Sequence, residues 1–174
     1  MTPQKQIALK RFLAFGIDGL VILFWAGVLF AAVMLAYAGQ PPAPKGPRAG
    51  QALGFFSMTL PVILYFSFCE ASAWQASIGK RVLSLRVVGD KRDRLPFSRV
   101  LIRNLVKFAP WELGHLVAQQ ALFSSSSGIP DWVFAPMVLS FLFPLWWVFS
   151  IYIRGNSPYD RMMGIHVALY DRKG

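Results

Sequence analysis

The sequence predicts an α-helical integral membrane bundle of about four transmembrane helices, with a small two-stranded β element on the cytoplasmic side. The 174-residue chain is 55% hydrophobic, with a mean hydropathy of +0.46, and is more apolar than an ordinary soluble domain. Several apolar runs approach the roughly 20 residues that cross a bilayer. The 18 basic residues, against 8 acidic ones, flank these runs. This pattern indicates one membrane domain over residues 1–174 and no nucleic-acid partner.

The first predicted span covers residues 12–38, and the second covers residues 52–70. Residues 39–51 between them form a Pro- and Gly-rich loop with two basic residues, which we expect outside the cytoplasm. Pro61 lies in the middle of the second span and predicts a kink. The basic N-terminus resembles a secretory signal, but the apolar run exceeds the usual length of about 7–15 residues and contains Asp18. We therefore expect an uncleaved anchor.

A basic segment follows the second span. Residues 71–107 hold nine basic and two acidic side chains, which predicts a cytoplasmic loop by the positive-inside rule. Within it, residues 81–88 alternate between apolar and polar side chains, as a strand does. From residue 97 to 123 the apolar spacing becomes helical. We expect the part from 105 to 123 to form the third span.

The C-terminal tail repeats the pattern of the basic loop. It follows an uncharged span over residues 132–153, and its residues 161–169 alternate as a strand does. Position by position, Lys80–Val87 aligns with Asp160–Val167. An isolated strand leaves its backbone groups unpaired, so we expect these two segments to pair. Pairing puts them on one side of the membrane, which requires two passes between them and places both termini in the cytoplasm.

Three blocks of the chain resemble the RDD family of bacterial membrane proteins. Arg11 and Asp18 match the entry of the family's first span. Glu70, followed by Gln75–Val88, resembles its second block. Tyr159–Val167 resembles its closing block, in which Asp160 matches the second aspartate. The blocks cover both ends and the middle of the chain.

The resemblance implies a multi-pass protein of the bacterial cytoplasmic (inner) membrane. Transport of undefined ligands has been suggested for the family, and sodium/proton antiport is proposed for some members. The chain departs from the family pattern at Ala76, where Thr is usual, and at Ile165-His166, where Thr-Arg is common. These departures leave the predicted architecture unchanged.

Asp18 is the leading functional candidate, because a charged side chain in hydrocarbon costs roughly 3 kcal/mol on insertion scales. It would bind a proton or small cation inside the bundle. The alternative is a structural carboxylate that another helix or the Lys80–Arg81 turn satisfies. The candidates for ion or proton handling are Asp18, Arg11, Glu70, Asp160 and Arg161, with Lys80, Arg81, Glu112 and His115 as secondary candidates.

Two of these candidate pairs have a structural reading beside the functional one. Glu112 and His115 are one helical turn apart and could relay protons, or could form an interfacial polar face. Asp160 and Arg161 could make cross-strand ion pairs, or could form a cytoplasmic gate for ions that reach Asp18.

These features leave two functions open. One is a transporter of small cations or protons, with sodium/proton exchange as one form, that uses an intramembrane carboxylate. The other is a non-transporting accessory or scaffold protein that binds anionic lipid or a partner through its basic loop, where Arg99, Arg103 and Lys107 share one lipid-facing helix face.

We also expect association between copies, because four helices rarely form a pore alone. The sequence has no Gly-rich phosphate loop, nucleophile elbow or set of zinc ligands, so we expect no enzymatic activity, no cofactor and no metal site.

Overall fold

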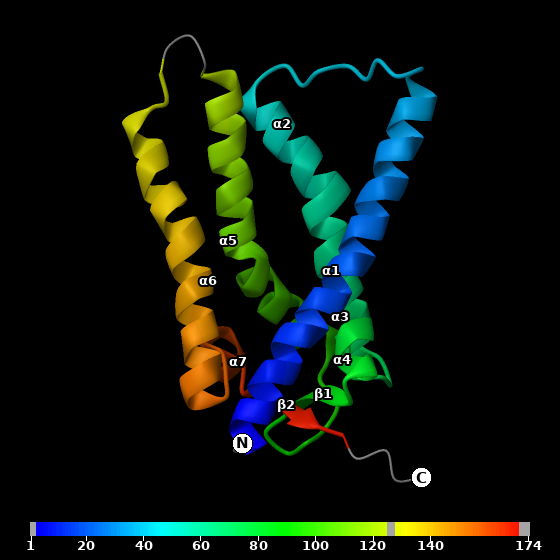
Figure 1. Cartoon of the computed structure of the whole chain (residues 1–174), viewed down its shortest axis with the longest axis vertical. Helices are drawn as coiled ribbons and strands as arrows, with labels where there is room; N and C mark the ends of the chain where they lie inside the picture. Colours follow the sequence, from blue (N-terminus) through cyan, green and yellow to red (C-terminus); the bar gives the residue numbers. More distant parts are fainter. Residues whose placement is uncertain (1–2, 125–127, 171–174) are drawn as a thin grey trace.

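The computed structural model describes residues 3–124 and 128–170, which form a bundle of long helices with a two-stranded sheet at one end (Figure 1). The long helical segments are α1 (Pro3–Ala36), α2 (Pro47–Gly54) continued by a π-helical turn (Phe55–Thr59) and α3 (Leu60–Ala71), then α5 (Phe97–Phe123), and α6 (Phe134–Arg154) after a 3-10 turn (Asp131–Val133). We call the end that carries the sheet the sheet end and the opposite end the loop end.

Three of the described helices are long and apolar enough to cross a membrane: Gln4–Ala36, Pro47–Ala71 and Asp131–Arg154. The chain is therefore a helical membrane protein with three candidate spans. The predicted helix over residues 97–123 is present as the 27-residue α5, but α5 is more polar and is not among the candidate spans. The predicted count of four spans is thus not confirmed.

Where the sequence predicts a kink at Pro61, a π-helical turn stands directly before α3. Proline has no N–H, so the carbonyl of Ser57 loses its usual donor four residues later. The backbone widens instead, and the N–H of Leu60 donates to the carbonyl of Phe55. The Ser57 carbonyl accepts a hydrogen bond of 3.0 Å from the indole Nε1 of Trp25. The proline thereby ties α1 to the second helical segment.

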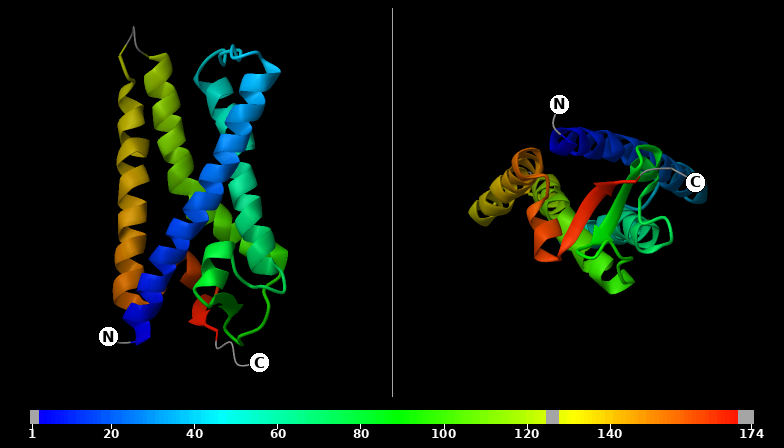
Figure 2. Two further views of the ribbon diagram at one scale, coloured as in Figure 1. Left: turned by 45° about the vertical axis from the view of Figure 1, so that its right-hand side comes forward. Right: turned by 90° about the horizontal axis from the view of Figure 1, so that it is seen from below.

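The predicted strand pairing is confirmed. β1 (Leu85–Gly89) runs antiparallel to β2 (Ile165–Leu169), and Val87 lies opposite Val167 at the centre of the register. Figure 2, seen from below, shows the two strands side by side across the sheet end.

The predicted strand limits, 81–88 and 161–169, are wrong at their N-terminal ends. The first residues of each form short helices, α4 (Ile78–Val82) and α7 (Pro158–Met162). Each helix has a serine N-cap whose side chain accepts from a backbone N–H three residues later, Ser77 from Lys80 and Ser157 from Asp160. These caps favour a helical turn over the extended conformation that the alternation predicted.

A shift of 80 residues maps one helix–strand unit onto the other, from Ser77 to Ser157 and from Leu85 to Ile165. The turn between helix and strand has a left-handed residue in both units, Ser84 with φ 57° and Gly164 with φ 55°. At Gly164 a Cβ atom would lie within 3 Å of the side-chain ends of Arg99 and Asp90, so a larger residue would require these side chains to move. The sheet end is therefore built from two copies of one local structure.

The apolar core also lies at the sheet end. It contains Leu85, Val87, Ile165 and Val167 from the strands, packed with residues of neighbouring segments such as Val100 of α5. A second cluster joins α3 to α5 through Phe66 and Phe108. By contrast, the most apolar window of α1 has no buried residue, as expected for a helix that faces lipid.

The pairing predicts a specific disulfide. The N–H of Val87 donates to the carbonyl of Gln75 at 2.6 Å, which makes Val87 and Val167 a non-hydrogen-bonded pair. Their Cα atoms should then be about 4.5 Å apart, within the range that a disulfide spans. In a Cys69→Ser background, we expect Val87→Cys with Val167→Cys to form a link on mild oxidation, measured by mass spectrometry of the joined peptides.

The control pair is Val87→Cys with Leu169→Cys, diagonal neighbours at about 7–8 Å, which should link poorly. Equal linkage of both pairs would contradict the register.

Candidate functional site

Five charged side chains form a buried network at the sheet end. Each comes from a different helix: Arg11 of α1, Glu70 of α3, Lys80 of α4, Arg103 of α5 and Asp160 of α7. Arg103 Nη1 lies 2.6 Å from Glu70 Oε2, and its Nε lies 2.7 Å from Asp160 Oδ1. Arg11 Nη2 lies 2.6 Å from Asp160 Oδ2, and Lys80 pairs with the other oxygen of Glu70. Arg103 therefore joins two carboxylates that are far apart in the sequence.

The network has more positive than negative charge, three cations for two carboxylates. Both carboxylates have no exposed surface, and Asn104 adds a hydrogen bond of 3.2 Å to Glu70. Burial alone would raise the pKa of Asp160, but the guanidinium groups of Arg103 and Arg11 outweigh burial and hold that pKa well below its usual range. Asp160 is thus ionised at neutral pH.

Asp18 lies beside this network and has its own hydrogen bonds. Its carboxylate accepts from the hydroxyl of Ser77 at 2.6 Å, the N–H of Gly79 at 2.8 Å and the hydroxyl of Tyr65 at 2.8 Å. Only 1% of its surface is exposed. Asp18 therefore ties the start of α4 to α1. Gly79 permits this approach, because a Cβ there would clash with the carbonyl oxygen of Ala14.

Three other predicted residues lie outside the network. Arg161 donates to the hydroxyl of Ser150 at 3.2 Å, and Arg81 stacks over Trp74, with its Cζ 4.1 Å from the ring centroid. Arg99 donates to the carbonyl of Met163 at 2.6 Å. Arg99 is thus bound to the end of α7 instead of facing lipid.

Arg103, also predicted to face lipid, is 1% exposed because it bridges the two buried carboxylates. Among the described residues, Lys107 has no carboxylate within 4.0 Å, and it borders the cavity described below. The spacing of four residues correctly predicted that the three basic side chains lie on one helix. Their surroundings, however, differ from one another.

Glu112 and His115 form a separate polar cluster toward the loop end. Glu112 accepts a hydrogen bond of 2.6 Å from the amide of Gln51 and another from the hydroxyl of Thr59, the last residue of the π-helical turn. His115 Nδ1 lies 3.3 Å from Glu112 Oε1, within ion-pair distance if His115 is protonated. The structure keeps the predicted pair together and separates it from Asp18.

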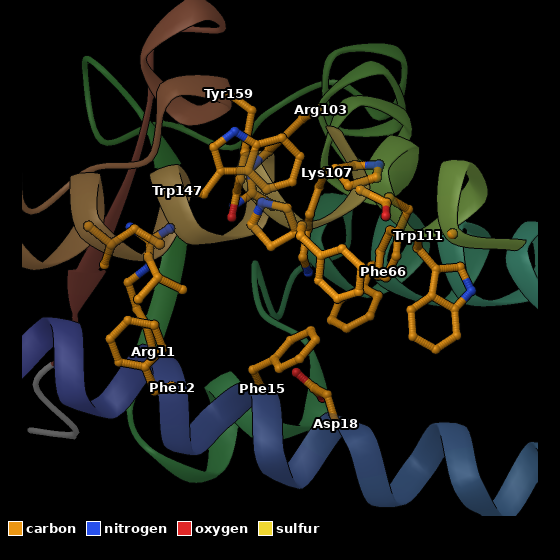
Figure 3. A pocket seen from close by; sticks show the side chains of 18 of the residues that line it. Arg11, Phe12, Phe15, Asp18, Phe66, Arg103, Lys107, Trp111, Trp147 and Tyr159 are labelled. Atoms are coloured by element: carbon orange, nitrogen blue, oxygen red, sulfur yellow. The ribbon is translucent and has the colours of Figure 1, made fainter. Parts of the chain in front are cut away.

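A cavity of about 560 Å³ lies between α1, α3, α5 and α6. Figure 3 shows Arg11, Phe15 and Asp18 of α1 on one side and Lys107, Trp111 and Trp147 on the other. The cavity extends from the charge network to His115. Within the described parts of the chain, no group of three or more His, Cys, Asp or Glu side chains could hold a metal ion.

Sequence reasoning missed three residues that complete the site, Tyr65, Ser77 and Asn104. Ser77 carried a signal, because a serine three residues before the N–H of Lys80 is a typical helix cap. Tyr65 and Asn104 lie in the middle of α3 and α5, and their sequence spacing alone identifies no partner.

The comparisons with known proteins give one match. A family model described as the RDD family matches residues 7–164, which include Arg11, Asp18, Glu70 and Asp160. No curated protein and no solved structure shows significant similarity to the chain.

The network predicts the effect of Asp160→Asn on stability. Removing one partner of a buried ion pair leaves uncompensated charge, here on Arg103 and Arg11, so we expect a loss of about 3–5 kcal/mol in the free energy of unfolding at pH 7. Because the folded pKa of Asp160 is lowered, its stabilising effect is present above the unfolded pKa of about 3.9 and is lost as the pH falls below it. Thermal unfolding in detergent at pH 7 and below pH 4 measures both effects.

The matched control is Asp131→Asn, an exposed carboxylate near the loop end. It should change stability little at either pH. A difference between wild type and Asp160→Asn that stays constant through the acid range would contradict the assignment.

Proposed function

The chain belongs to the RDD family, and we propose that this member is a bacterial inner-membrane protein that binds anionic lipid headgroups at its sheet end. We further propose that the sheet end faces the cytoplasm. The charge count supports this orientation: on this assignment 16 basic residues are cytoplasmic and 2, Lys45 and Arg48, are outside. Anionic lipid in the inner leaflet attracts such basic segments.

The observation that carries the proposal is a polar pocket of about 320 Å³ at the sheet end, lined by two arginines. Arg86 Cζ lies 3.4 Å from the ring centroid of Tyr170, as Arg81 lies over Trp74. Among the described residues, neither arginine has a carboxylate within 4.0 Å. Stacking orders each guanidinium while leaving its N–H donors for a phosphate group, which arginine binds in a bidentate manner.

The state of the carboxylates favours this function over cation transport through Asp18. Asp18 accepts three hydrogen bonds, and Glu70 and Asp160 each contact two cations. A small cation would have to displace these partners, at a cost of about 1–3 kcal/mol for each buried donor left unsatisfied. The surplus of positive charge nearby would also repel it.

Cation or proton exchange is the second candidate, and the pair Glu112 and His115 favours it. His115 borders the large cavity, whereas Glu112 borders a separate pocket of about 340 Å³ nearer the loop end. A titratable pair between two pockets is a suitable place for proton transfer. The adjoining π-helical turn is of a kind that often occurs at functional sites.

The lipid-binding proposal predicts that neutralising the two stacked arginines weakens the binding of an anionic lipid. We expect Arg81→Gln with Arg86→Gln to weaken the binding of phosphatidylglycerol by about tenfold or more, since each basic residue near an anionic surface contributes about 1 kcal/mol. Native mass spectrometry of protein released from micelles, titrated with this lipid, measures the change.

The control, Lys91→Gln with Arg92→Gln, removes the same charge from an exposed turn after β1. Equal weakening by both double variants would show that net charge, and not the stacked pair, attracts the lipid.

The exchange candidate gives a second prediction. In proteoliposomes with a sodium gradient and an internal pH dye, we expect proton flux no greater than in empty liposomes. A higher flux that Glu112→Gln abolishes and that a folded Asp18→Asn variant retains would overturn the primary proposal and assign exchange to the pair Glu112 and His115.

A further inference from the structure

The large cavity has a lining that is apolar along most of its length and positively charged at one end. Aromatic side chains reach it from five helices, among them Phe15 of α1, Phe66 of α3, Trp111 of α5 and Trp147 of α6. The charged side chains are at the sheet end, where the network and Lys107 lie. A molecule that fits this arrangement has an apolar body and one anionic end.

Of the lysine and arginine side chains that line the cavity, Lys107 is the one without a carboxylate partner among the described residues. Among the described residues, no carboxylate lies within 4.0 Å of its ammonium. The ammonium lies instead over aromatic rings, 3.7 Å from the centroid of Phe66 and 4.9 Å from that of Phe108. Cation–π contacts hold the side chain in place but leave its charge uncompensated in an apolar surrounding, where an unpaired charge is costly.

We propose that the cavity binds a single-chain anionic amphiphile, with its carboxylate or phosphate on Lys107 and its chain among the aromatic side chains. The charge complementarity selects an anion. The volume of about 560 Å³ is within the usual range of about 300–1,000 Å³ for small-molecule pockets, which suits one chain. This site is separate from the Arg81 and Arg86 pocket, and it does not depend on the proposed function.

The cavity has a natural reporter, because Trp111 and Trp147 both line it. Bromine atoms quench tryptophan fluorescence on contact, so a dibrominated stearic acid is a suitable probe. We expect saturable quenching of the full chain in micelles, and its loss in the double variant Trp111→Phe with Trp147→Phe.

Two variants test charge and space independently. Lys107→Gln should weaken the dibrominated acid at least tenfold, and Lys107→Arg should retain it. Gly114 also borders the cavity, and a Cβ there would meet no atom within 4 Å, so Gly114→Leu starts its side chain in open space. It should block binding while Lys107 is intact. The control, Lys91→Gln with Arg92→Gln, removes positive charge from the exposed turn after β1 and should bind the acid as wild type does.

Comparing different amphiphiles tests whether the anionic group is required and which headgroup binds. The methyl ester of the dibrominated acid should bind at least tenfold more weakly than the free acid, and equal binding would overturn the role of Lys107. A dibrominated lysophosphatidylglycerol compared with the acid shows whether the anion is a lipid phosphate or a free carboxylate. A dibrominated two-chain phosphatidylcholine serves as the control for quenching by bulk lipid. The site would be overturned if this lipid quenched all variants alike and the acid gave no saturable quenching.

Discussion

The structure of the sheet end depends on the buried guanidinium of Arg103, which bridges Glu70 and Asp160. A buried charge is tolerated only with nearly complete pairing, because its desolvation costs several kcal/mol. Three helices must therefore meet wherever Arg103 is buried. Arg11 and Lys80 complete the pairing from two more helices. The network therefore requires α1, α3, α4, α5 and α7 to meet at the sheet end.

The two helix–strand units supply two of the charged side chains of the network from equivalent positions. Under the shift of 80 residues, Lys80 is equivalent to Asp160, so one local structure presents opposite charges at the same position. Each pairs with residues of the long helices, Lys80 with Glu70 and Asp160 with Arg103 and Arg11. The antiparallel register centred on Val87 and Val167 relates the two units by an approximate twofold axis. The sheet is therefore the element that brings the opposite charges close together.

The sequence predicted the helices and strands better than it predicted the surroundings of individual side chains. Long apolar runs identified the helices, and alternation identified the strands, because these patterns are local. The short helices α4 and α7 could not be recognised from alternation, since a serine cap decides between helix and strand over five residues. The four-residue spacing of Arg99, Arg103 and Lys107 correctly gave one helix face. It could not show that a carbonyl, two carboxylates and a cavity lie opposite that face.

The ion pairs of the buried network also decide where an anion can bind in the large cavity. Arg11, Lys80 and Arg103 all border it, but each already contacts Glu70 or Asp160. An anion that took one of these cations would leave a buried carboxylate unpaired, at a cost of about 3–5 kcal/mol. At Lys107 the anion displaces no protein carboxylate of the described residues, and it replaces only part of a cation–π contact worth about 2 kcal/mol or less. The completeness of the network thus directs an anionic headgroup to Lys107 and leaves the apolar length of the cavity for its chain.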